Sequence, residues 1–390
     1  MSTDFQAYSS THYVDAAVDW NQLLDHGLEK APSYIVRKNG SYYEAINGST
    51  GKIDYGGPND HGGVSGSDPT SVIQSALNGL TNGRTWKEKV LLKGDFPIDH
   101  LSLPSYTVLE IQGRIKWRDG AADSNGFLRN SDQTSGNTEI EIVGGVIDGN
   151  KAGNTTGDVI RFQKVSRGII RNAKIMNGYN RGIWLIECSD CLIIDNEIYE
   201  CGHDWGNSNE VGEGVWLRDT IRTKVIRNRI HRAYRSGIFT ASTVTDYQKS
   251  HNIISLNQVY DIGSEGITQE SYARYDVICS NTISNTGSHG LKLWDAFNIA
   301  IGNTIYDSDG SGMRVKGSAH LIANNIIKKC QYDGINLLDD AFRIIVSQNY
   351  IEDCGEANTA SYVGIRIQDN GRECLIQGNS IRADVAKAIV

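Results

Sequence analysis

A short pattern of apolar and polar residues recurs along the chain from residue 170 onward. Each copy carries an Asn followed two positions later by an aliphatic residue, as in IIDNEIY and VIRNRIH. Successive Asn residues are 32, 29, 24, 22, 22, 24 and 30 positions apart, so the basic period is 22 to 24 with insertions. A period of this length predicts stacked repeats. We call these residues the Asn column: Asn196, Asn228, Asn257, Asn281, Asn303, Asn325, Asn349 and Asn379.

A second recurring pair, Gly followed by an apolar residue, lies between successive Asn positions. The first is Gly182-Ile183 and the last is Gly364-Ile365. The segments are too short for helices, and the Leu-x-x-Leu-x-Leu frame of a leucine-rich repeat is absent. Two columns in one register therefore predict an all-β fold, a single parallel β-helix of about ten coils whose inward aliphatic side chains stack as ladders.

The Asn column and the cysteines are predicted to be structural. We expect each Asn to adopt the left-handed conformation at a bend and to bond its side-chain amide to the copies above and below. Cys330 and Cys354 lie on adjacent coils, where a disulfide is allowed but not required. Cys188 and Cys191 are spaced like half of a metal site, but no second pair accompanies them, so no metal site is expected.

Upstream of the repeats, the sequence predicts a cap for the open end of the β-helix. Asp68 and Pro69 begin an amphipathic helix, and the strand segments KVLLKGDF and TVLEIQGRIKW follow it. This order, together with the turn Asp148-Gly-Asn150, resembles the N-terminal cap and first coil of the pectin-lyase-like superfamily. The resemblance spans residues 66–382 and implies a right-handed β-helix. The superfamily includes lyases, hydrolases, epimerases and viral spikes.

Three regions are expected along the chain. Residues 1–60 are predicted to form a small β appendage, with a short helix over residues 19–28 and a hairpin that turns at Asn39-Gly40. Residues 61–130 are assigned to the capping helix and the first coils, and residues 131–390 to the β-helix itself. The chain ends in ADVAKAIV without a recognisable cap, and a homotrimer that covers this end is one expectation.

The residue after each inward apolar position points outward, and three successive coils place aromatic rings there. Trp184, Trp216 and Phe239 are expected about 4.8 Å apart from coil to coil, as a strip able to stack sugar rings. The alternative is that the rings stack on one another as a surface ladder. Two insertions, residues 201–214 and 242–252, flank the strip, and long loops beside a rigid strip form cleft walls.

Charged residues gather beside the aromatic strip. Glycoside hydrolysis needs a proton donor and a second carboxylate, separated by about 5 Å for retention or about 6.5 to 9.5 Å for inversion. Glu213 and Glu265 share one column two coils apart, while Glu270 and Asp295 lie on neighbouring coils, so either pair fits this chemistry. Surface ion pairs are the alternative for each carboxylate. The catalytic candidates are Glu213, Glu265, Glu270, Asp295 and His289, and the substrate-binding candidates are Trp184, Trp216, Phe239, Arg218, Lys292, Trp294 and Arg314.

A lyase would use other members of the same cluster. Uronate elimination needs a base and a cation or metal that neutralises the carboxylate. The cluster of Lys292, Arg314 and Lys316, together with His289, fits these roles. In the chondroitinase and alginate lyase family of this fold, a Ser-Glu-x-Ile-x-x-Lys-Ser segment supplies a calcium-ligand Glu and a basic Lys. The nearest match is residues 264–271, which keep Glu265 but have Glu270 at the Lys position. No cofactor is predicted for a hydrolase, whereas for a lyase both a metal-free and a calcium-dependent mechanism remain open.

The motifs of two further families of this fold are absent. Mannuronan epimerases place Asp-Pro-His on the coil after the Asp-Gly-Asn turn, where this chain has Trp184 and Ile186. Polygalacturonases need an Asp-Asp pair before a Gly-His-Gly, whereas here Ser-His289-Gly precedes Asp339-Asp340. The sequence is therefore specific for the fold and not for the reaction.

Composition narrows the partners and the location. The chain has 390 residues and a formal net charge of -8, with 38 basic against 46 acidic residues, which disfavours nucleic acid as a partner. No apolar run approaches the ~20 residues of a membrane span, so no membrane partner is expected. The first residues lack the basic and apolar regions of a secretory signal, so we expect a virion component, an exported protein without its leader, or a cytoplasmic protein.

Three hypotheses for function follow, all with a polysaccharide or oligosaccharide as the partner and an extracellular or virion-associated location. The first is a glycoside hydrolase that uses paired carboxylates on the outward face of the β-helix. The second is a polysaccharide lyase that cleaves a uronate-containing polymer by β-elimination. The third is a non-catalytic carbohydrate-binding spike or tail protein.

Overall fold

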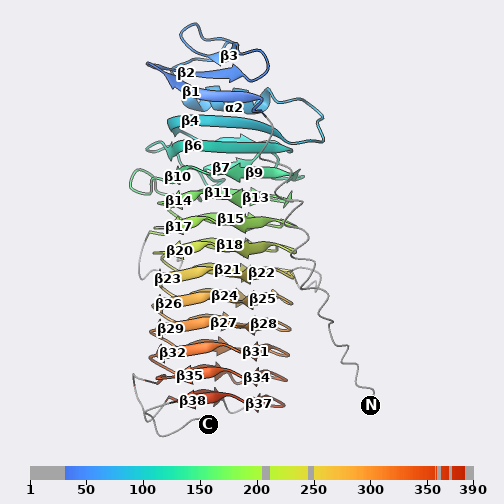
Figure 1. Cartoon of the computed structure of the whole chain (residues 1–390), viewed down its shortest axis with the longest axis vertical. Coiled ribbons are helices and arrows are strands. Elements are labelled where there is room, and N and C mark those ends of the chain that lie inside the picture. The colour runs from blue at the N-terminus through green and yellow to red at the C-terminus, as the bar shows by residue number, and fades with distance from the viewer. Residues whose placement is uncertain are drawn as a thin grey trace.

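Parallel strands stack coil upon coil along one long axis (Figure 1). The computed structural model describes residues 31–203, 211–244, 250–355, 357, 362–368 and 371–382. In this part of the chain the strands form one sheet of 25 strands, one of 11 and one of two. The predicted all-β fold, a right-handed parallel β-helix with an N-terminal capping helix, is confirmed. The helix expected over residues 19–28 lies outside the described residues.

The 11-stranded sheet carries one strand of each coil and presents the outward face on which the candidate residues were expected. Its strands are β5 (Leu101–Leu103), β7 (Leu128–Asn130), β11 (Ile160–Gln163), β15 (Ile183–Ile186), β18 (Val215–Arg218), β21 (Ile238–Ala241), β24 (Ile267–Glu270), β27 (Leu291–Leu293), β30 (Met313–Val315), β33 (Ile335–Leu337) and β36 (Ile365–Ile367).

The 25-stranded sheet wraps the rest of each coil. Its strands are β1 (Tyr34–Asn39), β2 (Tyr42–Asn47), β3 (Ile53–Gly56), β4 (Glu88–Ile98), β6 (Thr107–Trp117), β9 (Ile140–Val143), β10 (Val146–Asp148), β13 (Ile169–Arg171), β14 (Lys174–Met176), β16 (Leu192–Ile194), β17 (Glu197–Tyr199), β19 (Lys224–Ile226), β20 (Arg229–His231), β22 (Ile253–Ser255), β23 (Gln258–Ile262), β25 (Val277–Cys279), β26 (Thr282–Thr286), β28 (Ile299–Ile301), β29 (Thr304–Ser308), β31 (Leu321–Ala323), β32 (Ile326–Cys330), β34 (Ile345–Ser347), β35 (Tyr350–Glu352), β37 (Leu375–Gln377) and β38 (Ser380–Arg382). The two-stranded sheet pairs β8 (Asn137–Thr138) with β12 (Val165–Ser166).

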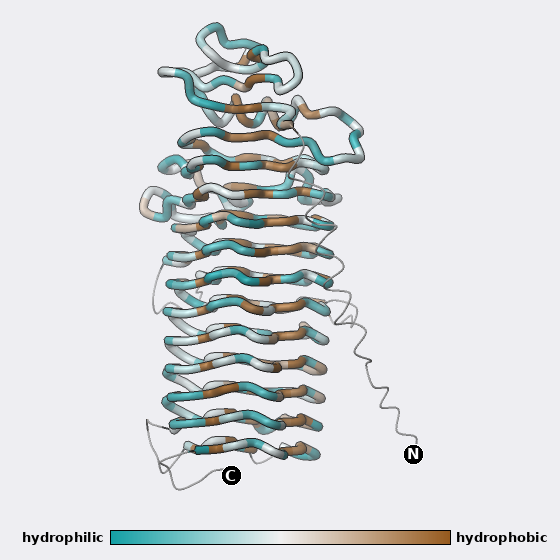
Figure 2. Tube along the Cα trace, viewed as in Figure 1, coloured by the Kyte–Doolittle hydropathy of each residue, from teal (hydrophilic) through white to brown (hydrophobic). Residues whose placement is uncertain are grey.

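The core is a set of aliphatic ladders. Ile267 of β24 pairs in register with Leu291 of β27, and both side chains are fully buried. Figure 2 shows the consequence as hydrophobic stretches that recur at the same place in successive coils. Gly266 enters β24 where an added Cβ would lie 2.7 Å from the carbonyl oxygen of Gly290, so the close approach of neighbouring coils requires glycine there.

The Asn column forms the predicted ladder of side-chain amides. The Nδ2 group of Asn281 donates to Oδ1 of Asn303 at 3.0 Å and to the carbonyl of Ile254 at 2.9 Å. The backbone N–H of Asn281 donates to the same Oδ1 atom at 3.0 Å. The expected left-handed conformation of the Asn residues is wrong: the preceding residue adopts it, as Ser280 does with φ 56°. That residue makes the bend, which leaves the Asn side chain free to point inward at its copies.

The N-terminal strands continue the larger sheet. β1 and β2 form the expected antiparallel hairpin, and Asn39 pairs with Tyr42. The turn residues are therefore Gly40 and Ser41, one position later than predicted, and Gly40 takes the left-handed φ of 61°. β1 also pairs in parallel with β4, so residues 34–56 join the β-helix through a shared sheet.

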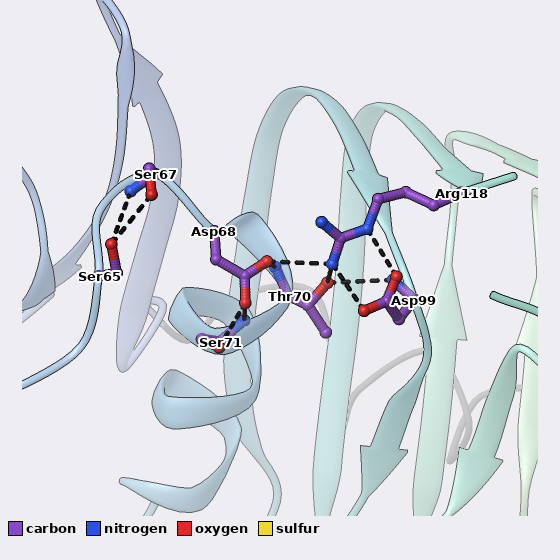
Figure 3. Close-up of polar contacts among 7 residues, drawn as sticks. All are labelled: Ser65, Ser67, Asp68, Thr70, Ser71, Asp99 and Arg118. Atoms are coloured by element: carbon purple, nitrogen blue, oxygen red, sulfur yellow. Dashed lines mark hydrogen bonds and ion pairs between the residues drawn. The ribbon is translucent and has the colours of Figure 1, made fainter. Parts of the chain in front are cut away.

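Helix α2 (Pro69–Asn78) lies against β4 at the N-terminal end of the stack (Figure 1). Asp68 caps it, since its carboxylate accepts hydrogen bonds from the first helical N–H groups. Arg118 donates to Asp68 at 3.2 Å and to Asp99 at 2.6 Å, which ties the cap to the first coils (Figure 3). No helix of the described residues, α2 included, is long and apolar enough to cross a bilayer. The buried residues of α2 are Pro69, Val72, Ile73, Ala76 and Leu77.

The cysteines of the described residues are free thiols. Cys330 and Cys354 are both buried on adjacent coils, and no disulfide joins them. The thiols of Cys188 and Cys191 donate to backbone carbonyls at 3.4 Å. These residues therefore act as small core side chains.

Candidate functional site

The outward face of the 11-stranded sheet carries one continuous column of side chains, in the register that the repeats predict. Trp184 of β15 pairs with Trp216 of β18, and Trp216 pairs with Phe239 of β21. Upstream, the register extends the column through Arg161 of β11 and Arg129 of β7 to Ser102 of β5. From coil to coil the column contains Ser102, Arg129, Arg161, Trp184, Trp216, Phe239, Thr268, Lys292, Arg314, Asn336 and Arg366.

The aromatic strip is a ladder of rings. Trp184 and Trp216 stack with their ring centroids 5.1 Å apart and their planes at 7°. Phe239 meets Trp216 edge to face at 85° and is 5% exposed. Because the two indoles cover each other, the strip does not present the open ring faces on which a sugar would stack.

Glu213 lies inside this face rather than on it. Its carboxylate is fully buried and lies 2.9 Å from Nε of Arg181 and 3.0 Å from Nη1 of Arg235. Arg181 also contacts Asp158 at 3.2 Å. Burial raises the pKa of Asp158, and the charge of Arg181 opposes that rise. Glu213 is thus held in a buried ion-pair network rather than presented to a substrate.

Glu265 lies two residues before β24 and Glu270 is its last residue, and the two carboxylates meet at one ammonium group. Lys292 of β27 donates to Oε1 of Glu270 and lies 3.9 Å from Oε1 of Glu265. Ser264 donates to the other oxygen of Glu265 at 2.8 Å. The glutamate side chains are 17% and 19% exposed, so both carboxylates reach the surface. The ammonium lies 3.8 Å from the ring centroid of Trp294, which closes one side of the cluster.

His289 lies on the next coil, beside the same lysine. The backbone N–H of Ser311 donates to its Nδ1 atom at 3.0 Å. Burial, with a further contribution from the charge of Arg314, lowers the pKa of His289 to about 4. The ring is therefore neutral at pH 7, and its proton resides on Nε2, since Nδ1 accepts a bond. Nε2 lies 3.4 Å from Nη1 of Arg314.

Asp295 lies on the turn that follows β27, apart from the Glu265 and Glu270 carboxylates. It accepts a hydrogen bond from the backbone of Tyr272 at 2.7 Å and pairs with Arg274. Glu270 bonds to Lys292 instead, so the expected pair of Glu270 and Asp295 is divided between two cations. Asp295 lines a shallow surface hollow of about 720 Å³ together with Arg274, Tyr275, Ala296, Phe297 and Ser318.

Of the three arginines that surround Trp184, the sequence analysis named Arg218 and missed Arg161 and Arg181. Arg161 lies 23 residues before Trp184, which is one repeat period, and this spacing is the signal that would have found it. Arg181 directly precedes the recurring Gly, a position that is Glu213 on the next coil. The sequence gives no sign that these two residues of one column would bond to each other across coils.

The residues near Glu265 do not fit a calcium ion. The carboxylate faces the ammonium of Lys292 rather than further oxygen ligands. Over the ranges that the structure describes, no group of three or more His, Cys, Asp and Glu side chains is arranged to hold a metal.

A family model described as a right-handed β-helix region matches residues 121–300 and 291–385. No curated protein sequence matches the chain.

Solved structures share the architecture at low sequence identity. The A-module of a mannuronan C-5 epimerase from Azotobacter vinelandii aligns with a TM-score of 0.71 and 17% identity, covering 83% of this chain and 94% of that one. The DFA-IIIase of Arthrobacter chlorophenolicus A6 aligns with a TM-score of 0.62 and 12% identity, over 81% and 94%. The Dettilon tailspike protein aligns with a TM-score of 0.51 and 14% identity, over 81% and 65%. Likeness at this level of identity shows the fold alone.

Proposed function

The chain belongs to the right-handed β-helix family. From this premise we propose that it is a polysaccharide-cleaving enzyme and, more specifically, a glycoside hydrolase. The observation that carries the proposal is the carboxylate pair of Glu265 and Glu270, both partly exposed and both in reach of Lys292. The fold is shared with a mannuronan epimerase, a DFA-IIIase and a tailspike protein, which supports a carbohydrate substrate and an extracellular or virion-associated place of action.

The chemistry assigned to the pair is that of a glycosidase. One carboxyl group protonates the oxygen of the leaving sugar while the other attacks the sugar carbon or activates a water molecule. Lys292 holds both carboxylates in place, and Ser264 fixes the second oxygen of Glu265. His289 presents a neutral Nε2–H group beside them, suited to hydrogen-bond a sugar hydroxyl.

Substitution of each carboxylate tests the proposal. Glu265→Gln and Glu270→Gln should each lower the cleavage rate by about 10²- to 10⁴-fold, the usual contribution of a general acid or base. The measurement is the release of reducing ends from a panel of soluble polysaccharides. Glu352→Gln is a matched control, because Glu352 forms an ion pair with Lys328 at 2.8 Å on the other sheet and should keep full activity. Full activity in both of the first two variants would exclude this site.

Elimination is the second candidate function, and the cations beside His289 favour it. Lys292 and Arg314 both lie close to the imidazole, where they would neutralise the carboxylate of a uronate sugar. A lyase releases an unsaturated product that absorbs ultraviolet light, whereas a hydrolase releases reducing ends without that absorbance. Binding without either product would instead support a non-catalytic spike or tail protein.

A further inference from the structure

Three guanidinium groups surround one tryptophan on the outward face. The Cζ atoms of Arg161, Arg181 and Arg218 lie 4.6, 4.4 and 5.2 Å from the ring centroid of Trp184. Arg181 also lies 4.1 Å from the ring of Trp216. We call these five residues the Arg–Trp cluster.

Of these three cations, Arg181 has close carboxylate partners, Arg218 has one carboxylate at the limit of an ion pair, and Arg161 has none among the described residues. Arg181 contacts both Asp158 and Glu213. No carboxylate of the described residues lies within ion-pair distance of Arg161, which donates to the carbonyl of Ser124. For Arg218, Asp219 lies 3.9 Å away, at the limit of an ion pair. Both oxygens of Asp219 already accept hydrogen bonds from the backbone and hydroxyl groups of residues 242–243.

The same cluster holds buried N–H groups that lack acceptors. They are Nε1 of Trp184 and Trp216 and Nε of Arg161 and Arg218, and none finds an acceptor among the described residues. A buried donor without an acceptor costs about 1 to 3 kcal/mol, so such groups call for an explanation. Burial also lowers the pKa of Arg161; the charge of Asp158 opposes this shift, and the charges of Arg218 and Arg181 add to it. A ligand with negatively charged oxygens would supply acceptors to these N–H groups and would neutralise the charge of the arginines.

We propose that the Arg–Trp cluster binds an acidic group, a carboxylate or sulfate, of an anionic polysaccharide. The cluster lies three coils from Glu265 and Glu270, about 14 Å at the usual spacing of parallel strands. One polymer chain laid along the stack would therefore reach both places. That the ligand is a polysaccharide rests on the proposed function. The new part of the inference is that this polysaccharide carries an acidic group, which the Arg–Trp cluster binds. The formal net charge of -8 weighs against nucleic acid as the anion.

Binding of defined polymers tests this inference apart from cleavage. All proteins carry Glu265→Gln so that the polymer stays intact, and the probes are polygalacturonate, dextran sulfate and uncharged dextran. The double variant Arg161→Gln/Arg218→Gln should bind polygalacturonate or dextran sulfate at least tenfold more weakly in affinity electrophoresis, and binding should depend less steeply on salt. Whichever acidic polymer responds identifies carboxylate or sulfate as the group bound.

Two controls keep the result interpretable. Arg343→Gln removes an exposed arginine that pairs with Glu373 on a distant turn, and it should leave binding unchanged. Arg218→Lys retains the charge but loses the planar guanidinium, so it should show an intermediate loss of binding. This single variant tests the inference if the double variant folds poorly.

Unchanged binding of both acidic polymers by the double variant would overturn the inference, as would an equal loss with uncharged dextran. Failure of the parent protein to bind either acidic polymer would overturn it too. If the binding result holds while Glu265 and Glu270 are dispensable for cleavage, the proposed function fails and the acidic-group site stands.

Discussion

Two ionisable residues lie fully inside the β-helix, in a second ladder of polar side chains. The backbone N–H of Asp276 donates to Oδ1 of Asn298 at 2.9 Å, and that of Asn298 donates to Nδ1 of His320 at 3.2 Å. Asn252 donates to Oδ1 of Asp276 at 2.8 Å from the other side. From coil to coil the ladder contains Thr223, Asn252, Asp276, Asn298 and His320.

The two ionisable groups oppose each other in their pH dependence. Burial lowers the pKa of His320 to about 4, so its contribution to stability is complete above pH 6.5 and is lost as the pH falls toward 4. Burial raises the pKa of Asp276 to about 6, so its contribution is lost as the pH rises from about 4 through 6. Between pH 4 and 6 the two effects partly cancel.

Replacing His320 with Asn should make the protein less sensitive to acid. The amide oxygen would still accept the bond from Asn298, and no group would remain to take up a proton. The loss in the free energy of unfolding between pH 6.5 and 4 should shrink by about 3 kcal/mol. Urea denaturation at a series of pH values measures it. His61→Asn, at a half-exposed position outside the ladder, should leave the pH profile as it is. An unchanged profile in the His320 variant would contradict this assignment.

At the scale of the element, the Asn column is a chain of interdependent hydrogen bonds. From Asn228 onward, Oδ1 of each Asn accepts from both the backbone and the side chain of the Asn one coil earlier, as Asn281 does for Asn257 at 3.0 Å. Deleting one side chain therefore leaves two buried donors without an acceptor.

Asn281→Ala should lower the free energy of unfolding by about 2 to 4 kcal/mol, the cost of the two orphaned donors. Asn379→Ala offers a matched comparison, since Asn379 accepts the same two bonds from Asn349 at 2.9 Å. That position is half-buried, so water can replace the lost acceptor and the loss should be clearly smaller. Equal losses at the two positions, measured by urea denaturation, would show that burial is not the source of the effect.

The sequence predicted the elements that follow from periodicity and missed those that depend on contacts between columns. The Gly and Asn positions placed every coil from Trp184 onward in register, because each recurs once per period. The second polar ladder left a weaker signal: Asn252, Asp276, Asn298 and His320 are 24, 22 and 22 residues apart but differ in residue type. Burial of Glu213 depends on two arginines from neighbouring coils, which a period does not reveal.

At the scale of the whole molecule, the N-terminal end of the stack needs its helix. The apolar face of α2 packs on β4 and closes the core. Leu77→Asp places a charge on that face, where the side chain is 1% exposed. The free energy of unfolding should fall by at least about 3 kcal/mol, and the uncovered core should cause self-association.

Size-exclusion chromatography with light scattering would detect the association, and thermal unfolding the loss of stability. Asn78→Asp adds the same charge to an exposed position of the same helix and should leave both measurements unchanged. A Leu77 variant that stays as stable and as monodisperse as the parent would show that α2 is dispensable as a cap.

Because the coils stack in register, the distance between two binding places on the β-helix is a whole number of coil spacings. The Arg–Trp cluster and the Glu265 and Glu270 pair are joined by an unbroken run of paired strands, from β15 through β18 and β21 to β24. Their separation can therefore change only by whole coils of about 4.8 Å, and never by the gradual loop adjustments through which most enzymes alter their clefts. A polymer therefore engages both places at once only when the spacing of its charged groups matches this fixed distance.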